Sequence, residues 1–185
     1  ETIDCGSYVR HKLRYVVGNQ EEIPAYLLVP TGVRMDLPAI VAMHQTNDFG
    51  KDEVVGLSGN KDYAYGLELV TRGYVVLAPD YLAAGERVFP GKGSFDSAPF
   101  YEKYPNWSMV GKDIVDTMST IDVLYTFDFV DKNNIGVIGH SHGGSNVIFA
   151  MALDERISAG ASNCGMSVIS EDEKCLEWST EDGYI

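Results

Sequence analysis

A serine between two glycines is the feature of this sequence most suited to chemistry. Gly139, Ser141 and Gly143 follow the pattern Gly-x-Ser-x-Gly, which is typical of a nucleophile held at a sharp turn between a strand and a helix. The turn lifts the hydroxyl clear of the backbone, and the flanking residues must be small because the helix then passes close to neighbouring strands. The first N–H groups of that helix face charge that develops on a substrate. The spacing therefore predicts a nucleophilic serine.

The residues around Ser141 supply the strand and the helix that such a turn requires. Apolar residues precede the turn and follow it at helical spacing: Ile135, Val137 and Ile138 before it, and Val147, Ile148, Met151 and Ala152 after it. This context is needed because so short a motif also arises by chance. The alternative is a glycine-rich turn that binds phosphate or no ligand, as in a flavodoxin-like protein. However, the glycines at 139, 143 and 144 do not fit the spacing of a dinucleotide loop.

Composition places the chain among ordinary globular proteins. Its 185 residues are 45% hydrophobic and 22% charged, which suits a single domain over residues 1–185 with a sizeable core. No apolar run approaches the length of a membrane span. The net charge of −13 argues against non-specific binding to nucleic acid or to an anionic membrane. No residue spacing indicates a metal site, and no motif indicates a cofactor.

Three cysteines, Cys5, Cys164 and Cys175, make an odd number without metal-site spacing. Reduced thiols in a cytoplasmic protein are the simplest interpretation. A Cys164–Cys175 disulfide in a secreted protein is the alternative.

The segments before Ser141 predict an antiparallel hairpin followed by alternating strands and helices. Near-continuous apolar strands are typical of parallel sheets that are buried on both faces, and hairpin turns and helix caps mark the boundaries. The expected elements are a hairpin over 7–30 with its turn at 18–21, a strand at 37–44, a polar loop at 44–50, a helix capped by Ser58 or Asn60 that ends at Gly73, and a strand at 74–80.

An aromatic-rich segment over residues 82–108 follows the last of these strands. Loops of this length in a compact domain are usually functional. We therefore expect it to form one wall of a pocket, with a packed surface Ω-loop as the alternative. Ser108 is expected to cap a helix through Tyr125, whose apolar residues recur every three or four positions. A further strand is expected at 157–165, after the helix that follows Ser141.

This order of elements predicts an α/β protein with a mostly parallel sheet and helices on both faces. With the serine turn on the third strand after the hairpin, the sequence resembles the α/β-hydrolase fold. Within that fold it is most similar to dienelactone hydrolases and acetyl xylan esterase-like carboxylesterases. The resemblance is carried by His-Gln-Thr at 44–46, Gly-Tyr-Val-Val-Leu-Ala-Pro-Asp at 73–80, Gly-Glu-Arg at 85–87 and the segment 135–144.

The resemblance implies hydrolysis of a small carboxylic ester or lactone through an acyl-enzyme at Ser141. It also implies an oxyanion hole made of two backbone N–H groups. One should belong to His142, the residue after the nucleophile. The other should belong to Thr46, with Gln45 as the alternative, because relatives often have His-Gly where this chain has His-Gln.

The resemblance further suggests substrate-binding residues in the segment after the 74–80 strand. Arg87 and Glu86 are candidates for orienting a polar or anionic substrate. The alternative for them is a surface ion pair, which contributes little energy. Trp107, in the aromatic-rich segment, is the third candidate for substrate contact.

The expected acid and histidine of the triad do not have clear positions in this sequence. In this fold they follow the serine in the order acid, then histidine, and both positions fall beyond Ile185. The chain therefore reads as the N-terminal portion of a longer domain that lacks the last strands, with little activity of its own. Acid candidates inside the chain are Glu171, Asp172 and Glu173, which could instead be solvated charges. His140, His142 and His44 are expected to point away from the hydroxyl or beside the pocket.

Two expectations follow from this interpretation. A non-catalytic binding module with the same fold is the functional alternative, because fold does not determine function. If the sheet ends at 157–165, that strand exposes an unpaired edge. Such an edge favours pairing with another chain as a homo-oligomer, or poor solubility.

Overall fold

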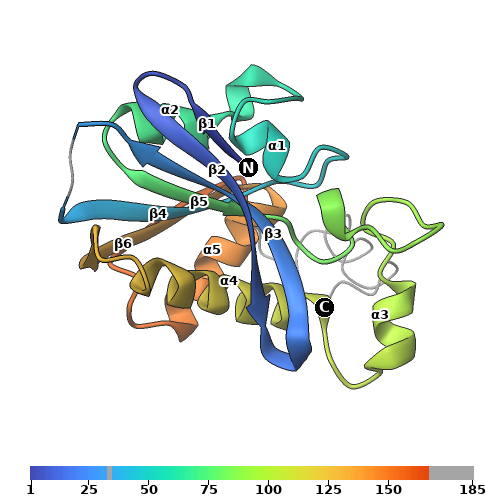
Figure 1. The fold of residues 1–185 in the computed structure, drawn as a ribbon. Coiled ribbons are helices and arrows are strands. Elements are labelled where there is room, and N and C mark those ends of the chain that lie inside the picture. Colours follow the sequence, from blue (N-terminus) through green and yellow to red (C-terminus); the bar gives the residue numbers. More distant parts are fainter. Residues whose placement is uncertain (33–34, 167–185) are drawn as a thin grey trace.

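A seven-stranded mixed sheet forms the centre of the protein (Figure 1). The computed structural model describes residues 1–32 and 35–166. The strands lie in the order β1-β2-β3-β5-β4-β6-β7. β1, β2 and β3 pair antiparallel, β3 is antiparallel to β5, and the remaining neighbours are parallel. The bounds are β1 Thr2–Asp4, β2 Tyr8–Val17, β3 Glu21–Pro30, β4 Leu37–Met43, β5 Val75–Pro79, β6 Val130–His140 and β7 Ala159–Asn163.

Helices cover both faces of this sheet. Ile121 and Leu124 of α4 and Val147 of α5 belong to the larger apolar cluster, whereas residues of α1 and α2 pack in a second cluster on the other face. Figure 1 shows these two layers on either side of the strands. None of the helices in the described part of the chain has the length and apolar character needed to cross a membrane. The bounds are α1 Lys51–Val54, α2 Tyr65–Thr71, α3 Ala98–Lys103, α4 Met109–Tyr125 and α5 His142–Leu153, with single 3₁₀ turns η1 Gly18–Gln20, η2 Lys61–Tyr63 and η3 Gly85–Arg87.

Most of the expected elements are confirmed. The hairpin turns at 18–20, and the apolar runs form β4, β5 and β6. The Ser108 hydroxyl oxygen accepts a hydrogen bond from the Gly111 N–H at 2.9 Å and so caps α4 as expected. The strand expected at 157–165 is present as β7.

Two expectations about helices are wrong in detail, and one short helix, α1, was not expected. Asn60 caps the short η2 turn, where its side chain accepts from the Asp62 N–H, and α2 begins only at Tyr65. The helix α1 follows directly on the polar loop at 44–50. The segment 82–108 contains η3 and α3, so it is only partly a loop.

Among the described residues, β7 pairs on one side only, with β6. All five of its residues are exposed. This agrees with the expected open edge, while assembly through it stays a prediction. Among the described residues, Cys5 and Cys164 form no disulfide. Cys175 and the acid candidates at 171–173 lie outside the described residues.

Candidate active site

Ser141 lies at a strained turn between β6 and α5. The strand ends at His140 and the helix begins at His142, while Ser141 itself has φ 51° and ψ −114°. A positive φ in a residue other than glycine is uncommon and is found at sites where the surrounding structure enforces it. The Ser141 N–H donates to the Asn163 carbonyl at 2.8 Å. The predicted strand–turn–helix geometry is therefore confirmed.

The glycines around Ser141 are required by close backbone contacts. A Cβ atom on Gly139 would lie 2.3 Å from the backbone of Gly143, and one on Gly143 would lie 2.2 Å from the Met43 carbonyl oxygen. Side-chain carbon atoms do not approach backbone this closely. The first turn of α5 thus rests directly on the end of β4, and only glycine fits at either position.

The loop after β4 begins beside the serine turn. Met43 pairs with Gly139 in the parallel ladder between β4 and β6, so the loop runs next to Ser141. Gln45 is partly exposed and Thr46 is exposed. Among the described residues, the N–H groups of Gln45 and Thr46 have no hydrogen-bond acceptor. They are therefore available as the oxyanion donors that the sequence suggests, a role that stays a prediction.

His44 is a structural residue in this arrangement. Its ring is fully buried. Its Nδ1–H donates to the Gln45 carbonyl at 2.7 Å, and its Nε2 accepts from the Tyr81 N–H at 3.2 Å. Both bonds together require the neutral imidazole, and burial lowers the pKa of His44. The expectation of a hydrogen-bonded loop histidine is confirmed.

The side chains next to Ser141 are engaged elsewhere. The His142 ring is buried beneath the turn, where its Nε2 lies 3.0 Å from a carboxylate oxygen of Asp113 on α4. The His140 ring stacks on Tyr63 at 4.8 Å, and its Nδ1 lies 3.0 Å from the side-chain amide of Asn163. These contacts agree with the expectation that a tight turn directs neighbouring side chains away from the nucleophile.

Asp113 is a buried group that sequence reasoning missed. Burial raises the pKa of Asp113, although the hydrogen bond with His142 opposes this effect. One of its oxygens has no hydrogen-bond partner among the described residues. Its burial could have been suspected from its position next to Ile114 in α4. The same helix also buries Asp116 and Thr117.

Arg87 lies in a largely buried network of four charged groups, of which Glu21 is partly exposed. It pairs with Asp116 at 2.8 Å and with Glu21, and it donates to the Asp80 carbonyl at 3.0 Å. Lys112 of α4 bridges the same two carboxylates. The Arg87 side chain is only 4% exposed. The alternative of a surface ion pair is therefore wrong for Arg87, and its role toward a substrate stays a prediction.

Glu86 pairs with a different set of cations. Its carboxylate lies 2.6 Å from Lys51, 2.9 Å from Lys12 and 3.1 Å from Arg14. Burial opposes its ionisation, but the hydrogen bonds and charges of Lys51 and Lys12 outweigh burial and lower the pKa of Glu86 to about 2. Lys51 in turn is buried against Asp80, at 2.6 Å. Glu86 and Arg87 thus pair with different charged side chains, and Asp80 contacts both groups, through its carboxylate and its carbonyl respectively.

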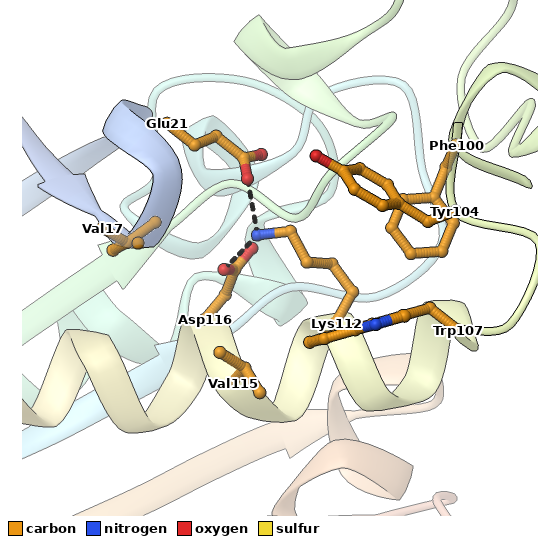
Figure 2. Close-up of a pocket in the computed structure, with 9 residues that line it drawn as sticks. Val17, Glu21, Phe100, Tyr104, Trp107, Lys112, Val115 and Asp116 are labelled. Atoms are coloured by element: carbon orange, nitrogen blue, oxygen red, sulfur yellow. Dashed lines mark hydrogen bonds and ion pairs between the residues drawn. The ribbon is translucent and has the colours of Figure 1, made fainter.

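Trp107 lines a cavity between the hairpin turn and α4 (Figure 2). The volume of this cavity is about 160 Å³. The Trp107 residue is 51% exposed. Figure 2 shows Phe100, Tyr104 and Trp107 facing the Lys112 side chain, whose ammonium group lies between two carboxylates. An adjoining cavity of about 300 Å³ shares the first two aromatic residues. The segment 82–108 therefore does form one wall of a pocket, although Ser141 lines neither cavity.

Comparison with known proteins decides the family. Residues 2–183, almost the whole chain, match the Abhydrolase family. The chain belongs to the Abhydrolase family. Its fold is accordingly an α/β-hydrolase fold, with the N-terminal antiparallel strands and the parallel core described above.

Individual relatives of this Abhydrolase chain agree with that assignment. YtaP of Bacillus subtilis (strain 168), whose name classes it as a hydrolase, is 31% identical over 153 residues, which are 80% of this chain and 50% of YtaP. A Bacteroides fragilis NCTC 9343 structure that carries the name of an acetyl xylan esterase has a TM-score of 0.75 at 22% identity, over 86% of this chain and 46% of its own. Acetyl xylan esterase 1 from Thermoanaerobacterium sp. JW/SL YS485 has a TM-score of 0.67 at 17% identity, over 100% of this chain and 66% of its own.

The chain spans about half the length of YtaP and of the Bacteroides protein. The similarity to the two solved structures concerns the fold alone.

Proposed function

We propose that this Abhydrolase protein is a serine-dependent hydrolase of small carboxylic esters or lactones. The observation that supports the proposal most is the backbone of Ser141, which holds φ 51° directly before the first residue of α5. Strain of this kind costs about 1–3 kcal/mol and persists only where the surrounding structure enforces it. A strained turn between a strand and a helix is the backbone geometry that presents the nucleophile in an α/β-hydrolase.

The chemistry proceeds through a covalent intermediate. The Ser141 oxygen attacks the ester carbonyl carbon while a base takes its proton, and the carbonyl oxygen becomes an oxyanion. The N–H groups of His142 and Thr46, or Gln45 in place of Thr46, hold that oxyanion. The alcohol leaves with the proton, and water then hydrolyses the acyl-enzyme to release the acid. This step needs a general base within hydrogen-bond reach of the Ser141 hydroxyl, and the chain spans only about half the length of YtaP.

The aromatic cavity gives Trp107 a place in this proposal. Ala25 of β3 pairs with Pro79, the last residue of β5, and the two strands are antiparallel. The hairpin turn that precedes Ala25 and forms one side of the cavity therefore extends past the C-terminal end of β5. That is also the edge of the sheet at which Ser141 lies. We propose that Trp107 contacts a part of the substrate that does not react. Arg87 and Glu86 support this edge through their ion pairs.

Hydrolysis of p-nitrophenyl acetate tests the proposal. Protein produced from the complete coding sequence should turn over the ester, and Ser141→Ala should lower kcat by at least about a thousandfold. The 185-residue chain alone should show little turnover. Covalent labelling of Ser141 by a fluorophosphonate probe gives a second readout. A complete protein that neither hydrolyses the ester nor takes up the probe would instead be a non-catalytic binding module.

A further inference from the structure

In the part of the chain that the structure describes, a buried glutamate on α1 has only uncharged hydrogen-bond partners. Glu53 is 3% exposed. One carboxylate oxygen accepts from the side-chain amides of Gln45 at 3.0 Å and Asn47 at 2.6 Å, and the other accepts from the Asn60 N–H at 2.9 Å. Within residues 1–32 and 35–166 no lysine, arginine or histidine forms an ion pair with it. A buried carboxylate held only by neutral donors is costly, which suggests that its geometry has a use.

The surrounding chain is shaped to bring that carboxylate to its donors. A Cβ atom on Gly59 would lie 2.5 Å from a carboxylate oxygen of Glu53, and Gly59 has φ +73°. The backbone therefore passes against the carboxylate at a position that only glycine fits well. This close passage also places the Asn60 N–H within hydrogen-bond distance.

Two of the three donors flank Thr46 in the loop after β4. Gln45 precedes Thr46 and Asn47 follows it, so the carboxylate holds the loop on both sides of Thr46. The side-chain oxygen of Asn47 accepts from the N–H groups of Phe49 at 2.7 Å and Gly50 at 2.6 Å, which fixes the turn into α1. The orientation of the Thr46 peptide thus depends on Glu53.

The same loop starts in direct contact with the serine turn. The carbonyl oxygens of Met43 and His44 pack on Gly143, where a Cβ atom would lie 2.2 and 2.8 Å from them. Glu53 holds the far side of the loop, and α5 holds the near side. Between these two anchors lie the N–H groups of Gln45 and Thr46, which have no acceptor among the described residues.

We propose that Glu53 is a positioning residue that aims the N–H group of Thr46, or of Gln45 in its place, at the oxyanion formed on attack by Ser141. The inference rests on the proposed ester hydrolysis. Oxyanion donors must be held within a fraction of an ångström, because a displacement of about 1 Å can lower a rate about a hundredfold. A carboxylate suits this task because its two oxygens can accept from several donors at once, whereas an amide offers one oxygen only.

Glu53→Gln tests the inference with almost no change of size. The new amide group faces either the Asn60 N–H or the two side-chain amides, so donor meets donor and the loop shifts. In protein produced from the complete coding sequence, we expect kcat for p-nitrophenyl acetate to fall about 10- to 100-fold. KM should stay within about twofold, since oxyanion contacts strengthen mainly in the transition state. Glu68→Gln, at an exposed ion pair on α2, is the matched control and should change neither constant.

A charge swap separates positioning from general destabilisation. In the double variant Asn47→Asp, Glu53→Gln, the new amide at position 53 can donate to the new carboxylate at position 47, and net charge is kept. We expect kcat to recover to within about fivefold of the wild-type value, with urea unfolding of every variant measured in parallel.

Three outcomes would count against this reasoning. Unchanged kcat in Glu53→Gln overturns the role of Glu53, provided that Ser141→Ala is inactive. A fall in kcat that matches only the loss of folded protein, without recovery in the swap, also overturns it. Full activity in Ser141→Ala removes the proposed hydrolase function itself, and the role of Glu53 with it.

Discussion

Replacing Arg87 by methionine should destabilise the protein rather than act on substrate binding alone. Methionine keeps much of the side-chain volume and removes the charge. The guanidinium group lies between Asp116 and Glu21 and donates to the Asp80 carbonyl. After the substitution, the remaining Lys112 faces two carboxylates, and the Asp80 carbonyl loses a donor in a buried position.

The size of the effect follows from burial. The side chains of Arg87 and Asp116 are 4% and 6% exposed, so solvent cannot replace the lost partner. Removing one member of a buried ion pair typically costs about 3–5 kcal/mol. For a chain of this length each kcal/mol shifts the melting temperature by about 2–4 °C. We therefore expect a loss of about 3–5 kcal/mol and a melting temperature lower by about 10 °C.

Urea unfolding followed by far-UV circular dichroism measures this loss, with Arg72→Met as the control. Arg72 pairs with Glu68 four residues earlier on α2, but its side chain is 67% exposed, so the control should lose at most about 0.5 kcal/mol. The double variant Arg87→Met, Asp116→Leu removes one charge of each sign. It should be more stable than Arg87→Met alone by at least about 1 kcal/mol, because one matched pair remains.

A loss below about 1 kcal/mol in Arg87→Met would refute the assignment of these charges to fold stability. If KM for an anionic ester rose at the same time, Arg87 would instead be the substrate-binding residue suggested by the sequence. Equal stability of the single and the double variant would show that the four charges do not act as a network.

Three further predictions concern the serine turn and Glu86. Ser141→Gly should relieve the strain at φ 51° and be about 1 kcal/mol more stable in urea than Ser141→Ala; equal stabilities would exclude strain. Gly143→Ala should cost about 3 kcal/mol in the same assay, because its Cβ meets the Met43 carbonyl, whereas Gly93→Ala, with open space around it, should be tolerated. Glu86 has a folded pKa of about 2 against an ordinary value of 4.5. The stabilisation by ionised Glu86 is therefore present above pH 4.5 and lost as pH falls toward 2. Glu86→Gln should lower the free energy of unfolding by about 2 kcal/mol at pH 7. The free energy of unfolding of this variant should also depend less on pH between pH 5 and 3 than that of the wild type.

The sheet could be predicted because its strands carry local signals. Apolar runs and turn residues mark the hairpin, β4, β5 and β6, and Ser108 marks the start of α4. The serine turn could be predicted for the same reason, since strand, glycines and helix follow one another directly. These features depend on neighbouring residues and can be read along the chain.

The helix α1 and the charged networks could not be predicted, because their partners are distant in sequence. α1 has only four residues, three of them charged, and Lys51 and Glu53 are buried through contacts made after folding. Arg87 pairs with Glu21, 66 residues away, and with Asp116, 29 residues away. Nothing near Arg87 in the sequence distinguishes it from a surface arginine, so its burial became visible only in three dimensions.

The hydrogen bond from the Ser141 N–H to the Asn163 carbonyl has a consequence for the outer strand. Two more hydrogen bonds join the same regions, from Ser145 to the Gly165 carbonyl and from Ser162 to the Gly144 carbonyl. Fraying of β7 would therefore release the backbone that carries the nucleophile. Amide hydrogen exchange at Ser141 should follow exchange in β7, and whatever docks along that strand should slow both together.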